Sequence, residues 1–337
     1  MLENNPILEV KKLKKYFPIT KGFLRKKIGE IKAVDDVNFN LLPGETLGLV
    51  GESGCGKSTV ARSVLRALEP TSGQILFQEN DLIQDLTVLN KDELKLARRN
   101  IQMIFQDPFS SLNPRQRVRD IIGEPLLVNK VEKGAQLEER VRNLMVAVGL
   151  RPEYMIRFPH AFSGGQRQRI GIARALSLNP KLIFLDEPVS ALDVSIQAQI
   201  LNLLKDLQEE FKLTYLFISH DLGVVQHICD RVAVMYLGKI VETASVKNIF
   251  KNPQHPYTEA LLNASPKPHP KFRNKVKILS GEVPNPANTP KGCHFESRCP
   301  YSKSICKEEY PPLQEIKASE EQYVACHFSQ EINLKGI

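Results

Sequence analysis

Three glycines and one lysine stand close together in the stretch Gly51-Glu-Ser-Gly-Cys-Gly-Lys-Ser-Thr59. The spacing fits G-x-x-x-x-G-K-[ST], the pattern of a loop whose backbone N–H groups surround nucleotide phosphates. Glycine permits the tight turn and the close approach to an anion that such a loop needs. Lys57 would reach the β- and γ-phosphates, and the Ser58 hydroxyl would help to hold Mg²⁺. The alternative is a glycine-rich turn with an exposed lysine.

We predict that most of this stretch contacts a nucleotide. The residues concerned are Gly51, Ser53, Gly54, Cys55, Gly56, Lys57, Ser58 and Thr59. Cys55 is expected to serve only as a small residue between glycines. Alternatively, the helix N-terminus and Lys57 lower the pKa of its thiol and make it oxidisable.

Two carboxylates follow an apolar run in Leu182-Ile-Phe-Leu-Asp-Glu187. A strand that ends in Asp beside a phosphate loop supplies a further contact to Mg²⁺, which we assign to Asp186. Glu187 would polarise the attacking water as a general base. Alone, such a run is more typical of a surface turn, and only the phosphate loop gives it this meaning.

A second glycine-bearing stretch, Phe162-Ser-Gly-Gly-Gln-Arg-Gln-Arg169, precedes a predicted helix at 170–176. Ser163 and Gly165 would lie at a helix N-terminus, where free N–H groups and the helix dipole attract anions. One chain would then carry two phosphate-binding helix ends for one triphosphate. The alternative is an ordinary N-cap followed by a basic solvated face.

The elements that must position these residues can also be predicted. Short apolar runs predict strands at 8–13, 33–42, 46–50, 181–185 and 213–219. Apolar residues at helical spacing predict a helix at 59–68, after the phosphate loop, and a mostly helical region at 107–160. The last two strands flank a helix with an apolar stripe from Ile196 to Phe211, which indicates a βαβ unit.

Composition narrows the class of protein. The 337 residues suffice for a sizeable core and a smaller second unit. No apolar run approaches the roughly 18 residues that cross a bilayer, and no N-terminal signal segment is evident, so we expect a cytosolic location, free or docked. The net charge is +8, and nine Lys or Arg lie between Lys11 and Lys32. This stretch is either a solvated loop or a contact with anionic lipid or a partner.

The phosphate loop and the motifs "SGGQ", "LIFLDEP", "SALD" and "ISHD" follow one another in this order. Together they span about residues 7–245 and resemble the nucleotide-binding subunit of an ABC transporter, which implies an ATPase. Such subunits dimerise head to tail, so that each ATP lies between the phosphate loop of one and the "SGGQ" segment of the other. The resemblance therefore explains the two phosphate-binding helix ends.

The same resemblance implies roles for further residues. Gln106 is similar to the loop glutamine that senses Mg²⁺ and the transmembrane partner, and His220 to the switch histidine that contacts the γ-phosphate. Asp193 would lie at the dimer seam. Tyr16 or Phe17 would stack on adenine, and we favour Phe17. The predicted catalytic side chains are thus Lys57, Glu187 and His220.

The fold that these motifs imply is α/β. It comprises a P-loop ABC ATPase core of the RecA-like type with a β-rich N-terminal subdomain, an inserted α-helical subdomain and a small Cys-rich C-terminal appendage. The expected segments are 1–106 and 166–264 for the two parts of the core, 107–165 for the helical subdomain, and 265–337 for the appendage.

The branch of the family is indicated by the C-terminal part. Asn252-Pro-Gln-His-Pro-Tyr-Thr-Glu-Ala-Leu-Leu262 and Gly281-Glu-Val-Pro284 resemble the extension of the oligopeptide/dipeptide importer ATPases. The long basic stretch before Ala33 is more similar to their F-type than to their D-type subunit. Nickel and glutathione importers share the extension, so the cargo stays open.

This branch implies a set of partners. We expect two transmembrane permease subunits, a sister D-type ATPase (or a homodimer of the isolated chain) and, indirectly, an extracytoplasmic peptide-binding protein. The chain would lie on the cytoplasmic face of the membrane as a peripheral subunit. A soluble ABC ATPase acting on nucleic acid is the alternative of another class. It is disfavoured because no long coiled-coil insert, second cassette or stacking platform is evident.

Four of the six cysteines lie in the last 45 residues, at Cys293, Cys299, Cys306 and Cys326. In a reducing compartment disulfides do not persist, whereas a small Pro-rich segment needs a staple such as a metal. Zinc sites usually show paired C-x2-4-C knuckles, which are absent, and iron–sulfur sites vary more in spacing. Zinc, an iron–sulfur cluster and free thiols therefore all remain open from the residues alone.

The resemblance favours one of these alternatives. In the importer family the matching cysteines hold a [4Fe–4S] cluster, and "GCHFESRCP" and "VACHF" match that region. We expect His294 and His327, which follow ligand candidates, to be surface or supporting residues, and Cys229 to lie in the core. Because Lys57 and Glu187 lie elsewhere in the chain, loss of the cluster should change transport far more than basal ATP hydrolysis.

Overall fold

The computed structural model describes residues 5–22, 26–79, 82–107, 109–264, 281, 284–316 and 321–337. These residues form two units. Unit 1 contains the described residues of 1–41, 46–88 and 219–337, and unit 2 those of 42–45 and 89–218. The proline-rich stretch at 265–280 lies outside the described residues. The boundaries of the four predicted segments stay a prediction.

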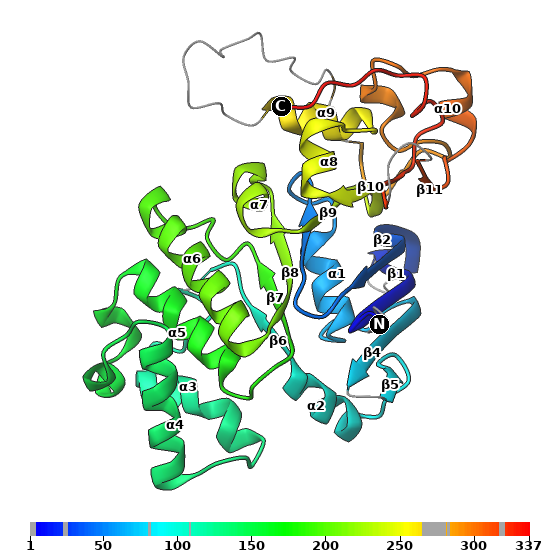
Figure 1. Ribbon diagram of the computed structural model, residues 1–337. Helices are drawn as coiled ribbons and strands as arrows, with labels where there is room; N and C mark the ends of the chain where they lie inside the picture. Colours follow the sequence, from blue (N-terminus) through cyan, green and yellow to red (C-terminus); the bar gives the residue numbers. More distant parts are fainter. Residues whose placement is uncertain are drawn as a thin grey trace. The chain divides into compact units, whose positions relative to one another are not determined.

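Unit 1 contains two sheets (Figure 1). An antiparallel sheet has the strand order β2-β1-β4-β5, and a mixed sheet runs β11-β12-β10-β9-β3. The strands are β1 (Leu8–Lys21), β2 (Lys26–Leu41), β3 (Thr46–Val50), β4 (Ser72–Glu79), β5 (Leu82–Asp85), β9 (Arg231–Tyr236), β10 (Lys239–Ser245), β11 (Gln314–Glu315) and β12 (Tyr323–Val324). The helices are α1 (Lys57–Val64), α7 (Leu222–Ile228), α8 (Val246–Lys251), α9 (Pro256–Ala264), the 3₁₀ turn η4 (Glu296–Arg298) and α10 (Ser304–Glu308).

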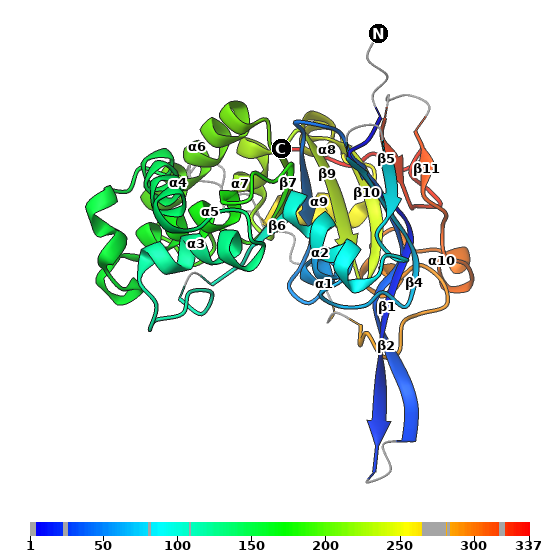
Figure 2. The same cartoon turned by 90° about the horizontal axis from the view of Figure 1, so that it is seen from below.

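The basic N-terminal stretch forms a long hairpin. β1 and β2 pair from Leu8 opposite Leu41 to Lys21 opposite Lys26, whereas β1 pairs with β4 only as far as Lys14. Figure 2 shows the outer part of the hairpin extending beyond the rest of its sheet. The expectation of a solvated loop is therefore wrong for the described residues of this stretch, which are paired strands.

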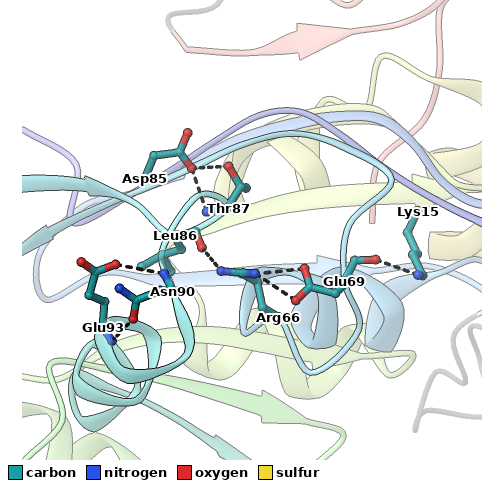
Figure 3. Close-up of polar contacts among 8 residues, drawn as sticks. All are labelled: Lys15, Arg66, Glu69, Asp85, Leu86, Thr87, Asn90 and Glu93. Carbon is teal, nitrogen blue, oxygen red and sulfur yellow. Dashed lines mark hydrogen bonds and ion pairs between the residues drawn. The ribbon is translucent and has the colours of Figure 1, made fainter.

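The predicted helix at 59–68 is shorter in the structure. α1 ends at Val64, and Arg66 adopts the left-handed conformation with φ 52°. Its guanidinium donates to the Glu69 carboxylate at 3.1 and 3.0 Å and to the Leu86 carbonyl at 2.9 Å, while Lys15 Nζ donates to the Glu69 carbonyl at 2.7 Å (Figure 3). These bonds join the end of α1 to β1 and to the residue that follows β5.

Unit 2 contains a parallel sheet of order β8-β7-β6 with helices around it (Figure 1). Its strands are β6 (Ile101–Ile104), β7 (Leu182–Asp186) and β8 (Thr214–Ser219). Its helices are α2 (Lys91–Asn100), α3 (Val118–Val128), α4 (Gly134–Ala147), the 3₁₀ turns η1 (Pro152–Ile156) and η2 (Pro159–Ala161), α5 (Gly164–Leu176) and α6 (Val194–Phe211). The β7-α6-β8 crossover confirms the predicted βαβ unit.

Helices α4 and α6 of unit 2 bury apolar side chains at helical spacing, in regions that the sequence predicts to be helical. In α4 the side chains of Val141, Leu144 and Met145 are buried, and the helix ends before Gly149, which has φ 70°. α2 begins with a capping box in which Asn90 and Glu93 bond each other's backbone N–H groups (Figure 3). None of the helices among the described residues is long and apolar enough to cross a membrane.

Candidate functional site

The phosphate loop lies between β3 and α1, and two of its glycines have no room for a side chain. A Cβ on Gly51 would lie 2.1 Å from the Met235 carbonyl oxygen. Gly56 has φ 112°, and a Cβ there would lie 2.1 Å from the Ala33 carbonyl oxygen. Glycine is therefore required at both positions by close backbone approach, as in loops that wrap an anion.

Lys57 lies at the centre of this loop and is only 4% exposed. Its ammonium donates to the backbone carbonyls of Gly51, at 2.8 Å, and Glu52, at 3.0 Å. It is also the first residue of α1, whose N-cap Gly56 offers no side-chain acceptor to the free N–H groups. A cation and the N-terminus of a helix are thus placed together, an arrangement that binds phosphate.

The other loop residues are placed as follows. Ser53 and Gly54 are exposed at the tip, and Ser58 and Thr59 are half-buried in the first turn of α1. Cys55 is buried, and this burial raises the pKa of its thiol. Burial outweighs the effect of Lys57, so the expected lowering of this pKa is not found.

The two carboxylates lie at the end of β7 in unit 2. Asp186 is 1% exposed, whereas Glu187 is half-buried and has a positive φ of 47°. The backbone N–H of Glu187 donates to the Ile218 carbonyl at 3.0 Å. Gln106, in the loop after β6, donates from Nε2 to Glu187 Oε2 at 2.8 Å. Gln106, which is predicted to bind Mg²⁺, and Glu187, which is predicted to activate water, are thus hydrogen-bonded to each other.

Ser163 and Gly165 lie at the start of α5. Ser163 is the N-cap and accepts from Gln166 N–H at 3.4 Å, while the Gln166 side chain accepts from Ser163 N–H at 3.1 Å. A Cβ on Gly165 would lie 2.5 Å from Cγ2 of Ile196 in α6. The hydroxyl therefore caps the helix, and the glycine permits close packing of α5 on α6.

Two residues with roles implied by the family motifs are exposed. His220 directly follows β8, and Asp193 is the N-cap of α6, with no side-chain bond to the helix. The turn before Asp193 is held by Gln197, whose Nε2 donates to the carbonyls of Val189 and Leu192 at 3.0 and 2.9 Å.

The two candidates for stacking on adenine differ in their contacts. The Tyr16 hydroxyl donates to Asp35 Oδ1 at 2.5 Å, and burial together with this carboxylate raises the pKa of Tyr16. Asp35 also contacts Lys239 Nζ at 3.1 Å. Phe17 is half-buried beside Lys15, whose Nζ lies 5.0 Å from the ring centroid. The hydrogen bond to Asp35 therefore holds the Tyr16 ring against strand β2. The Phe17 ring has no hydroxyl that could form such a bond.

All four C-terminal cysteines line one pocket of unit 1 as free thiols. Burial raises the pKa of Cys293 to about 12 and that of Cys299 to about 11, and it also raises the pKa of Cys326. Within the described part of the chain, no three His, Cys, Asp or Glu side chains are grouped so that they could hold one metal ion. Among the described residues the structure therefore supports neither the predicted [4Fe–4S] cluster nor the zinc alternative.

The histidines near this pocket have other partners. His294 Nδ1 lies 3.1 Å from the Leu237 carbonyl oxygen, and His327 Nε2 lies 3.0 Å from the Glu309 carbonyl oxygen. His255, which the sequence analysis did not single out, also lines the pocket. Its Nδ1 accepts from the Tyr257 N–H at 3.0 Å, and burial lowers its pKa to about 3. It is therefore a neutral ring with its proton on Nε2.

The C-terminal residues also pack on the rest of unit 1. β12 pairs with β10, with Val324 opposite Glu242, so this segment shares the sheet that contains β3. Phe295 is 1% exposed, and its ring lies 5.3 Å from that of Tyr236 and 5.4 Å from that of Tyr257. The prediction that Cys229 lies in the core is confirmed, because it is buried beside β3.

Comparison with known proteins gives two family matches. The family described as "ABC transporter" matches residues 34–190, and the one described as "Oligopeptide/dipeptide transporter, C-terminal region" matches residues 241–306. The chain is 56% identical to the oligopeptide transport ATP-binding protein AppF of Bacillus subtilis, over 95% of this chain and 97% of that one. It is 49% identical to the dipeptide transport ATP-binding protein DppF of Haemophilus influenzae, over 93% and 94% of the two chains.

Solved structures with the same fold are also found. cbiO1 of Clostridium perfringens, part of the ABC transporter complex cbiONQ, matches with a TM-score of 0.61 and 28% identity, over 73% of this chain and 91% of that one. The ATP-binding cassette MJ0796, a dimer bound to ADP and Pi in a post-hydrolysis state, matches with a TM-score of 0.60 and 28% identity, over 71% and 98%.

Proposed function

Because this chain belongs to the ATP-binding proteins of ABC transporters, in the oligopeptide/dipeptide branch, we propose that it hydrolyses MgATP to drive peptide import. The observation that carries this proposal is identity of 56% and 49% to two peptide-transport ATP-binding proteins over nearly the whole chain. The chain would act on the cytoplasmic face of the membrane, with two permease subunits, a sister D-type ATPase and, indirectly, an extracytoplasmic peptide-binding protein.

We assign the following roles toward MgATP. The loop amides and Lys57 bind the β- and γ-phosphates, and Ser58, Gln106 and Asp186 hold Mg²⁺, which neutralises charge on the phosphates. Glu187 accepts the proton of the attacking water, a role that the hydrogen bond from Gln106 supports because it orients the carboxylate.

Two further contacts complete the proposed nucleotide site. His220 would contact the γ-phosphate, and its exposure directly after β8 is consistent with that role. Phe17 rather than Tyr16 would stack on adenine, because the Tyr16 hydroxyl is already bonded to Asp35.

A second ATPase subunit would complete the site. Its "SGGQ" segment would present Ser163, Gly165 and the N-terminus of α5 to the γ-phosphate, with Asp193 at the seam. The dimeric state of MJ0796 with ADP and Pi supports this proposal for a relative. Catalysis would then rest on positioning and charge neutralisation around the γ-phosphoryl group.

We propose that the cysteine pocket holds a [4Fe–4S] cluster that acts as a structural staple. Four thiols line one pocket, which fits a cluster ligated by four Cys. The residues that would hold the group are Cys293, Cys299, Cys306 and Cys326.

The function is tested by reconstitution of the whole transporter in lipid vesicles with its peptide-binding protein. We expect ATP hydrolysis to rise when a di- or oligopeptide is supplied, and to be lost in Lys57→Ala. Stimulation by nickel or glutathione instead of peptides would overturn the assignment of cargo. Stimulation by nucleic acid with no dependence on the membrane subunits would overturn the transport function itself.

A further inference from the structure

Glu52, the second residue of the phosphate loop, forms an ion pair with the C-terminal segment. Its carboxylate accepts from both terminal nitrogens of Arg298, with Nη1 to Oε2 at 2.9 Å and Nη2 to Oε1 at 3.0 Å. The Arg298 side chain is 7% exposed and that of Glu52 is 27% exposed. The pair is thus bidentate and largely shielded from water, a geometry that fixes orientation as well as distance.

Every polar group of Glu52 has a partner near the loop. Its backbone N–H donates to the Tyr257 hydroxyl at 2.9 Å, and its carbonyl accepts from Lys57 Nζ at 3.0 Å. Arg298 in turn donates to the Tyr236 hydroxyl at 3.4 Å. Glu52 therefore links the lysine of the loop to two tyrosines and to the guanidinium of Arg298.

The charge of Glu52 needs this partner. A carboxylate in a loop that binds polyphosphate repels the ligand unless a cation neutralises it. Arg298 lies against that carboxylate and is the residue before Cys299, which lines the cysteine pocket. The cation that pairs with the Glu52 carboxylate therefore comes from the C-terminal segment.

We propose that Arg298 is a positioning residue of the nucleotide site. Through its ion pair with Glu52 it fixes the start of the phosphate loop and neutralises the Glu52 carboxylate. MgATP affinity therefore depends on whether the C-terminal segment is docked. This inference rests on the proposed function, in which the loop binds MgATP. If the pair were merely structural, its loss would lower the stability of the fold, and nucleotide affinity would not depend on the charge at these two positions.

The test measures MgATP affinity of the full chain by equilibrium binding, for Arg298→Met and for the double variant Glu52→Gln/Arg298→Met. Arg298→Met leaves Glu52 unneutralised, and we expect affinity to fall on the order of tenfold to a hundredfold. The double variant removes both charges, and we expect it to regain much of the affinity. At saturating ATP, kcat should change only a few-fold.

Glu52→Gln alone is the matched control, since it keeps the shape of the side chain and removes the charge that Arg298 neutralises, so we expect MgATP affinity not to fall. If Arg298→Met does not fold, Arg298→Gln replaces it, because Gln also lacks the charge but keeps a polar group toward Glu52, and the same loss of affinity is expected. Wild-type affinity in the single variant, or no recovery in the double variant, would overturn the inference. Absence of MgATP binding by the wild-type chain would overturn the proposed function together with it.

Discussion

Ser163 allows the proposed second phosphate contact to be tested without damage to the fold. Its hydroxyl caps α5 by accepting from Gln166 N–H at 3.4 Å, and the Gln166 side chain completes the capping box. Asp and Asn cap helices about as well as Ser. We therefore expect Ser163→Asp and Ser163→Asn to change the free energy of unfolding by no more than about 0.5 kcal/mol.

The two variants should differ strongly in assembly. The Asp carboxylate would lie where the γ-phosphate bound by the other subunit is proposed to lie. Two unit charges about 4 Å apart repel by about 4 kcal/mol at an effective dielectric constant near 20. That energy corresponds to about a thousandfold weaker ATP-dependent dimerisation for Ser163→Asp. Ser163→Asn has a side chain of the same size with no charge and should stay close to the parent.

The assay is light scattering with ATP in a Glu187→Gln background, which slows hydrolysis and so preserves the dimer. Nucleotide binding to the monomer should be equal in both variants. Equal dimerisation of Ser163→Asp and Ser163→Asn would refute the composite site. Gly165→Asp is a poorer probe, because any Cβ at Gly165 would lie 2.5 Å from Ile196 and disturb the packing of α5 on α6.

Three further outcomes are expected. Glu187→Gln should lower turnover about 10²- to 10⁴-fold while MgATP still binds, since Gln can accept from Gln106; phosphate release near the wild-type rate would remove Glu187 from its role. Phe295→Ala should lower the free energy of unfolding by about 3–5 kcal/mol in denaturant titrations, because the ring is 1% exposed, and Phe295→Leu should lose less. Protein purified without oxygen should be brown and contain about four irons per chain, and Cys306→Ser should remove this colour and expose residues 284–337 to protease. Zinc in the metal analysis would refute the cluster but would leave the structural role of a bound metal intact.

The sequence predicted the parts of the fold that local patterns encode. The strand at 46–50, the crossover of β7, α6 and β8, and helices within 107–160 are all present, because burial imposes continuous apolar runs on buried strands and a period of 3.6 residues on helices. The early end of α1 was missed, since Arg66 turns there to bond Glu69 and Leu86, which are contacts of tertiary structure. The outer part of the basic hairpin was missed because its side chains are half-buried or exposed and show little alternation.

The sequence predicted the motifs of the candidate site, but not the hydrogen bonds and contacts that join them in the structure. Nothing in the local sequence relates Gln106 to Glu187 as hydrogen-bonded neighbours, because each follows one of two parallel strands, β6 and β7, whose pairing is set by the sheet. The cysteine spacing indicated a metal, whereas His255, which lines the same pocket, lies far from the cysteines in the chain. Long-range pairing of this kind leaves no short-range pattern.

The pair of Glu52 and Arg298 changes one expectation that followed from sequence distance alone. Because the cysteines lie far from Lys57 in the chain, loss of the proposed cluster was expected to spare basal ATP hydrolysis. In the structure Arg298 directly precedes Cys299 and bonds Glu52, whose carbonyl accepts from Lys57. A change that frees the C-terminal segment therefore removes the partner of Glu52 as well. Cys306→Ser should accordingly weaken MgATP binding to a degree similar to Arg298→Met, and unaltered affinity in protein that has lost its iron would show that Arg298 stays docked without the cluster.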